Sequence, residues 1–162
     1  MNDDYDLEVL LELREQKKEG AEQEYADAVA ELGRRKEYLA RQREALREMV
    51  AQRERERERF ARRRDAGEAT SGELVQFRGY IRGLKQDEAE MEAEIERAEE
   101  AVETQQERVG QAREGLSEAI RELEAVEQHR EEWEAEQQRV TKRRESSAMD
   151  DVAARIWREN NS

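Results

Sequence analysis

Residues 74–140 read LVQFRGYIRGLKQDEAEMEAEIERAEEAVETQQERVGQAREGLSEAIRELEAVEQHREEWEAEQQRV. Apolar side chains recur here every seven residues, in two rows three positions apart, and the positions between them are mostly charged. This repeat is the seam of a coiled coil, and so narrow a stripe, kept over about ten heptads, predicts a rod rather than a globular domain. The rows are Leu74, Ile81, Ile95, Val102, Val109, Leu116 and Leu123, and Phe77, Leu84, Met91, Ala98, Ala112, Ala119, Val126, Trp133 and Val140.

A weaker seven-residue row precedes this stretch and predicts a first helix over about residues 5–64. Between the two rows, residues 65–72 hold the chain's clustered helix breakers, which indicates a bend. Gly67 can adopt the left-handed conformation that closes a helix. Thr70 and Glu73 have the spacing of a capping box, so a second helix is expected over about 71–158. The first row is Leu11, Lys18, Tyr25, Leu32, Leu39, Leu46, Arg53 and Phe60.

A short bend between two amphipathic helices makes them antiparallel neighbours, because each can then bury its stripe on the other. The sequence therefore predicts an all-α fold, a long antiparallel two-helix coiled-coil hairpin that forms a single rod over residues 1–162. A bend near residue 69 places Phe60 opposite Phe77. The basic stretch 34–64 then faces a partner stretch that includes the acidic run from Asp87 to Glu103.

The second helix is longer than the first, so about twenty C-terminal residues are expected to overhang, by the rise per residue of a helix. Ser147 and Asp150 repeat a capping pattern, whereas serine is also tolerated inside helices. The overhang is therefore either a separate short helix or a continuation of the second helix.

The composition is typical of a long helix rather than a packed domain or a disordered chain. Charged residues make up 45% of the 162 residues, and proline and cysteine are absent. The lack of cysteine suits a reducing cytosol, and the acidic start of the chain is unlike a secretory signal. We expect a cytoplasmic protein without stable membrane insertion.

The sequence contains no pattern of enzyme chemistry. Its glycines never take the spacing of a phosphate-binding loop, its carboxylates have no enclosing pocket, and His129 has no second histidine at metal-ligand spacing. The formal net charge of −13 repels nucleic acid. We expect a protein that is not an enzyme and that binds no cofactor, metal or nucleic acid.

One candidate interaction segment is FRGYIRGL, residues 77–84. Phe77, Ile81 and Leu84 occupy seam positions, Tyr80 lies at the margin of the seam, and two glycines fall on the outer face. These small outer residues would let a partner approach the backbone beside Tyr80. The alternative is that the seam residues are simply core.

The overhang is the second candidate segment. Basic residues, among them Arg143 and Arg144, are followed by a short apolar set that contains Ile156 and Trp157. An unpartnered tryptophan beside basic residues is typical of an interface anchor. The alternative is a frayed terminus.

The whole layout resembles the FliJ/YscO family of type III secretion systems, flagellar or injectisome. The resemblance rests on chain length, two unequal helices, a glycine-containing bend, and the segments LVQFRGYIRGLKQDE (74–88) and MDDVAARIWR (149–158). It implies a non-enzymatic stalk that looks like the central coiled coil of the rotary ATPase γ subunit. Such a stalk is cytoplasmic and lies peripherally at the inner-membrane export apparatus.

The resemblance also implies the partners. The family's stalks bind and stimulate a hexameric secretion ATPase and link it to the cytoplasmic domain of the export gate. The positions that match the gate-binding segment are Phe77, Tyr80, Ile81 and Leu84. The positions that match the ring-binding end are Arg143, Arg144, Ile156 and Trp157.

Two other classes of function stay open from the residues alone. One is a cytoplasmic scaffold, in which residues 65–72 are a skip in one continuous helix that pairs as a parallel dimer. The other is an escort that binds helical partners or export chaperones and their clients. The hairpin predicts a monomer when free, of 19.1 kDa, and the scaffold predicts a dimer.

Overall fold

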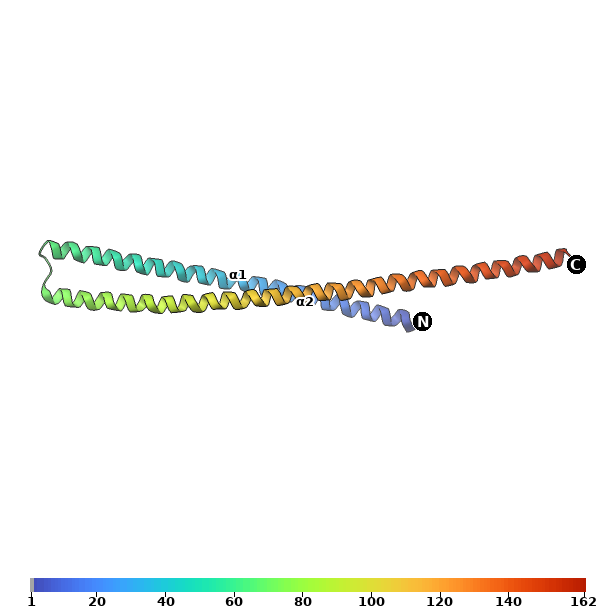
Figure 1. Ribbon diagram of the computed structural model, residues 1–162, viewed down its shortest axis with the longest axis horizontal. Helices are drawn as coiled ribbons and strands as arrows, with labels where there is room; N and C mark the ends of the chain where they lie inside the picture. Colours follow the sequence, from blue (N-terminus) through green and yellow to red (C-terminus); the bar gives the residue numbers. More distant parts are fainter. Residues whose placement is uncertain (1) are drawn as a thin grey trace. The chain divides into compact units, whose positions relative to one another are not determined.

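The computed structural model describes the backbone of residues 2–162 and the side chains of residues 6–162. Within these residues the chain forms two α helices and no strand: α1 spans Asn2–Asp65 and α2 spans Ser71–Asn160 (Figure 1). The two helices pack against each other, so the predicted all-α hairpin is confirmed. Helix α2 continues unbroken through Ser147, which selects the continuous form of the overhang.

The bend closes with backbone hydrogen bonds of its own. Gly67 has a φ of 74°, its N–H donates to the Arg64 carbonyl at 3.0 Å, and the Glu68 N–H donates to the Arg63 carbonyl at 2.9 Å. This pair of bonds is the Schellman closure of a helix. The predicted cap of α2 is also present, because the Thr70 hydroxyl accepts a bond from the Glu73 N–H at 3.2 Å.

The predicted capping box also implies a return bond from the Thr70 N–H to the Glu73 carboxylate, and this detail is wrong. The Glu73 carboxylate instead accepts a hydrogen bond from the Arg63 guanidinium at 2.8 Å. Arg63 belongs to the last turn of α1, so this charged pair joins the two helices across the bend. A charge-assisted bond to arginine is stronger than one to a neutral amide.

Contacts divide the chain into two compact units. The bend unit is Glu24–Arg113, and the terminal unit is Met1–Gln23 with Glu114–Ser162. The single rod expected over residues 1–162 stays a prediction. Across the bend unit, side chains that meet have residue numbers that add to between 132 and 142, which gives an antiparallel register close to the expected one.

The core of the bend unit is the predicted seam. Leu39 from α1 packs with Ile95 and Ala98 from α2 in one buried cluster. Nearer the bend, the rings of Phe60 and Phe77 stack with their centroids 4.1 Å apart, as the register predicted. Stacked aromatic pairs add about 0.5–1.5 kcal/mol to the burial of their surface.

The terminal unit has a shorter paired part and an unpaired part. Leu7 of α1 and Ala119, Leu123 and Val126 of α2 are buried. Arg14 and Lys17 both contact the Glu122 carboxylate, at 3.1 and 2.7 Å, and Arg130 contacts Glu8 at 2.8 Å. Every side chain from residue 141 to residue 162 is exposed; this segment is the overhang.

Candidate interaction surfaces

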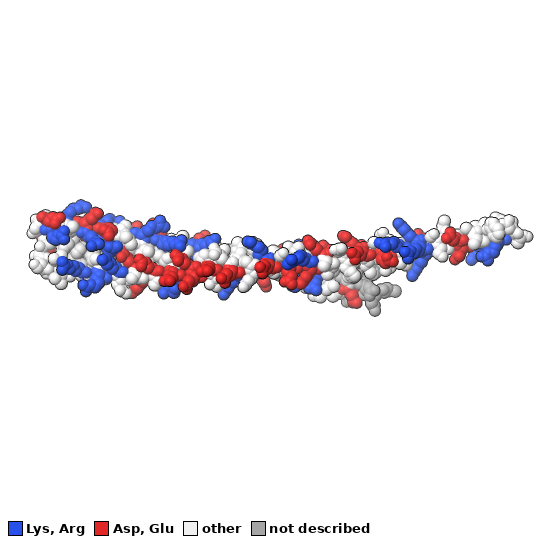
Figure 2. All heavy atoms as spheres, in the orientation of Figure 1, with Lys and Arg blue, Asp and Glu red and all other residues white. Residues whose placement is uncertain are grey.

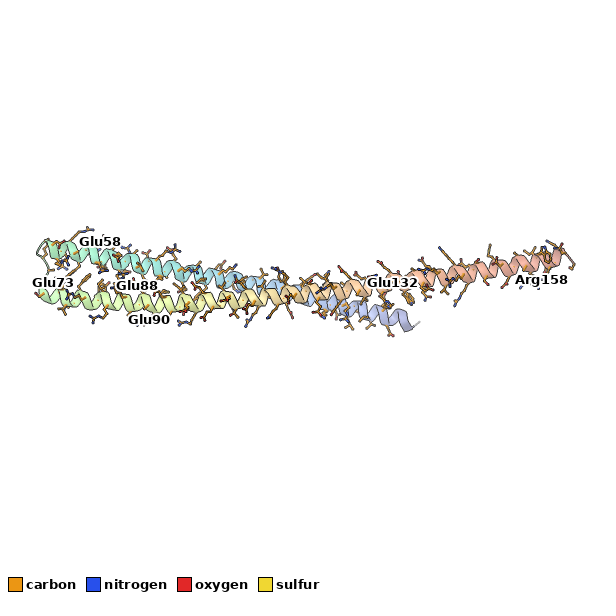
Figure 3. All side chains as sticks on the ribbon, in the orientation of Figure 1. Glu58, Glu73, Glu88, Glu90, Glu132 and Arg158 are labelled. Carbon is orange, nitrogen blue, oxygen red and sulfur yellow. The ribbon has the colours of Figure 1, made fainter. Side chains whose placement is uncertain are left out.

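Two polar side chains of α2 occupy seam positions in the bend unit, and sequence reasoning missed both. The first is Glu88, whose carboxylate contacts the Arg53 guanidinium at 2.9 Å. Both side chains are largely buried, with 9% of Glu88 and 14% of Arg53 exposed. The hydrogen bond to Glu88, more than any other cause, raises the pKa of Arg53. Figure 3 shows Glu88 on the side of α2 that faces α1 and Glu90 on the opposite side.

The second missed residue is Gln105. Its Nε2 donates to the Ala28 carbonyl of α1 at 3.0 Å, and in the other direction Arg35 of α1 donates to the Ala101 carbonyl of α2 at 2.9 Å. The Oε1 atom of Gln105 is buried without a partner among the described residues. Positions 88 and 105 fall on the two seven-residue rows, so the heptad count itself was the signal that would have found these residues.

The four candidates near the bend do not form one exposed surface. Ile81 is buried, Phe77 stacks on Phe60, and Leu84 is half-buried, so these three pack along the seam. Tyr80 is 47% exposed, and its ring lies 6.5 Å from that of Phe77. Of the four, Tyr80 is the side chain that a partner can contact directly.

A shallow groove lies beside the bend, between α1 and α2, and we call it the bend groove. Phe60, Leu74 and Phe77 form its apolar floor, with Arg57 and Arg64 of α1 and Arg78 of α2 on its rim. Tyr80 does not line it. Arg78 directly follows the seam residue Phe77, and Tyr80 directly precedes the seam residue Ile81. Because successive residues of a helix are about 100° apart, Arg78 and Tyr80 flank the seam of α2 on opposite sides.

The overhang exposes large apolar side chains, with Trp157 67% and Ile156 52% exposed. Ile156 belongs to a stripe that also contains Met149 and Val152. The candidates Arg143 and Arg144 lie about 20 Å away along the helix axis, at 1.5 Å per residue. The structure therefore places the two basic and the two apolar candidates at successive levels of one helix.

The apolar stripe of the overhang does not continue the seam. Extended past residue 140, the row of Leu74 passes through Arg144, Asp151 and Arg158, and the row of Phe77 passes through Ser147 and Ala154. Met149 and Ile156 each precede one of these residues by two positions, which is about 160° around the helix. The stripe thus faces away from the side on which α2 packs against α1.

Other charged groups form pairs on the surface. Tyr38 donates to the Glu94 carboxylate at 2.6 Å, which lowers the pKa of Glu94 and raises that of Tyr38. Hydrogen bonds from Arg34 and then Arg35 lower the pKa of Glu31. No group of side chains in the described residues is arranged to hold a metal ion. Over the same residues, neither helix has an apolar stretch that would cross a bilayer.

The fold defines the class of the protein as an all-α coiled-coil hairpin. More narrowly, the chain belongs to the YscO-like protein family, whose family model matches residues 2–161. The family consists of non-enzymatic proteins associated with type III secretion. No curated protein and no solved structure matches the chain.

Proposed function

We propose that this protein is the central stalk of a type III secretion export apparatus. The overhang binds and stimulates the hexameric export ATPase, and the segment around Tyr80 contacts the cytoplasmic domain of the export gate. The protein acts in the cytoplasm, peripherally at the inner membrane, and is a monomer when free. Family membership over residues 2–161 supports this role.

The observation that carries the proposal is the overhang. A continuous helical segment whose side chains are all exposed from residue 141 onward has no packing role in the terminal unit. Tryptophan is among the side chains that most often anchor protein interfaces, and Trp157 lies exposed on this segment beside Ile156. Arg143 and Arg144 have no ion-pair partner among the described residues, so their charges are free for a second contact.

The gate contact rests on Tyr80 and on what holds it. Phe77, Ile81 and Leu84 fix the helix by packing in the seam, and Tyr80 projects from its margin with nearly half of its surface exposed. Gly79 and Gly83 lie beside it with no atom within 4 Å of the position that a Cβ would take. A partner can therefore approach the α2 backbone closely at this point.

The test is to mix the purified chain with its cognate export ATPase and to measure binding and ATP hydrolysis. Deletion of residues 139–162, or Ile156→Asp with Trp157→Ala, is expected to abolish binding and stimulation. Circular dichroism should change little apart from the deleted turns, because Val140 is the one deleted side chain that is half-buried. Arg47→Glu, on an exposed part of α1, is the control and should keep stimulation. Wild-type protein that neither binds nor stimulates the ATPase would contradict the proposal.

The gate arm is tested separately with Tyr80→Ala, which is expected to weaken binding to the gate's cytoplasmic domain and to leave ATPase stimulation intact. The escort alternative predicts a different result. Binding of export chaperones or their clients would then persist after deletion of residues 139–162 and loss of the ATPase contact.

A further inference from the structure

The bend end of the hairpin is basic although the chain as a whole is acidic. Residues 53–85 carry ten basic and six acidic side chains, whereas the whole chain has a formal net charge of −13. Figure 2 shows Lys and Arg gathered on both helices at this end, and carboxylates along the part of α2 that follows. A local basic field on an acidic protein attracts acidic partners to that place.

The bend groove combines this charge with an apolar floor. The buried Phe60 ring and the half-buried Leu74 and Phe77 lie between rim arginines that come from both helices. A groove between two helices is the shape into which a third amphipathic helix packs. Its apolar floor selects a partner with an apolar anchor, and its rim selects carboxylates.

The rim guanidinium groups are weakly engaged within the protein. The closest carboxylate to Arg64 is that of its neighbour Asp65, at 3.5 Å, and Arg57 reaches Glu54 at 3.9 Å. Arg78 has no ion-pair partner among residues 6–162. The one acidic residue of the groove, Glu58, is paired with Arg62 at 3.7 Å. Two of the three guanidinium groups are thus only loosely paired and the third is unpaired within the same residues, so all three can take carboxylates from outside in the bidentate form that arginine favours.

We propose that the bend groove binds an acidic amphipathic helix of a partner protein. Its apolar side chain lies on Phe60, Leu74 and Phe77, and its flanking carboxylates pair with the rim arginines. The groove is on the other side of the α2 seam from Tyr80, so this contact is distinct from the gate contact and does not rest on the proposed function.

A second copy of the chain is the competing occupant, because the acidic first part of α1 exposes Val9 and Leu13 beside Glu8 and Glu12. Its binding would make the free protein a dimer, which light scattering detects. An anionic membrane is a poorer occupant, because the net charge of −13 repels it.

The test measures fluorescence anisotropy of a labelled Leu/Glu peptide of about four helical turns, with leucines on one face and glutamates beside them. The same peptide with lysine in place of glutamate is the charge control. The groove variant is Arg57→Gln, Arg64→Gln and Arg78→Gln, and the control variant is Arg47→Gln, Arg55→Gln and Arg59→Gln. Both variants remove three exposed arginines and keep good helix formers.

We expect saturable binding of the Leu/Glu peptide, about tenfold or more weaker for the groove variant and within about twofold of wild type for the control variant. Equal losses in both variants, equal binding of the lysine peptide, or no saturation at about 1 mM peptide would overturn the proposal. So would a wild-type dimer in light scattering that the groove variant lacks, since the second copy would then be the occupant. Binding to phosphatidylglycerol vesicles that only the groove variant loses would likewise assign the groove to a membrane.

Discussion

Replacement of Gln105 by leucine is expected to stabilise the hairpin. The Gln105 side chain is 3% exposed and makes one hydrogen bond, from Nε2 to the Ala28 carbonyl at 3.0 Å, while its buried Oε1 has no partner. The bond is worth about 1 kcal/mol net, and an unpaired buried oxygen costs about 1–3 kcal/mol. The Ala28 carbonyl lies inside α1, so it keeps its helical bond after the substitution.

Leucine has a similar length and adds apolar surface to the seam, so we expect the free energy of unfolding to rise by about 1–3 kcal/mol. The assay is urea unfolding followed by circular dichroism at 222 nm, with a higher midpoint and an unchanged slope. Gln106→Leu is the matched control, because Gln106 is the next residue and is exposed. The control should stay within about 0.5 kcal/mol of wild type.

A Gln105→Leu protein less stable than wild type by more than about 1 kcal/mol would refute this reasoning. Such a loss would mean that the Gln105 amide has all its hydrogen bonds in solution and contributes more to the free energy of unfolding than its single bond indicates. A stabilised variant in which spin labels at positions 39 and 98 report several distances would show that the amide selects the register, a known use of polar seam residues.

Three further predictions concern the ring stack, the bend and pH. Phe60→Ala should lower the free energy of unfolding, measured in urea, by about 3 kcal/mol, because it empties a buried seam position and removes a ring stack. Phe60→Leu should recover much of this loss. Equal losses in the two variants would exclude the cavity as the cause. Gly67→Ala should destabilise the protein by about 1 kcal/mol, because the φ of 74° at this position is costly for alanine. Gly79→Ala, in an open helical position, should stabilise the protein by up to about 1 kcal/mol. Changes of the same sign in the two variants would contradict this prediction. Lys17 lowers the pKa of Glu122 below its ordinary 4.5, so Glu122→Gln should melt at a lower temperature than wild type at pH 7. Because the folded pKa is depressed, this difference should be present above pH 4.5 and vanish as the pH falls through the folded pKa; a difference that persists at lower pH would assign it to packing.

The fold could be predicted because it depends on a periodicity that many residues repeat. No single substitution in the rows changes the seven-residue count, and Gly67 and Thr70 mark the bend through local conformational preferences that need no tertiary partner. The Phe60–Phe77 stack then follows from the position of the bend alone.

A search for apolar residues alone misses the polar seam residues, because Glu88 and Gln105 occupy row positions without being apolar. Their burial depends on which groups face them, and the arginine opposite Glu88 is known only once the register is fixed. The bend groove was missed for a related reason. Its rim comes from both helices, and the arginines of α1 alternate with glutamate, which in sequence reads as an internally neutralised, solvated face.

The self-contained closure at Gly67 has a consequence for how this chain folds. Pairs next to the bend, such as Arg63 and Glu73, are ten residues apart in sequence, whereas Glu8 and Arg130 of the terminal unit must close a loop longer than a hundred residues. The entropy of loop closure favours the short loop, so pairing should nucleate at the bend and zip outward. Substitutions there should slow refolding, whereas those in the terminal unit should mainly speed unfolding.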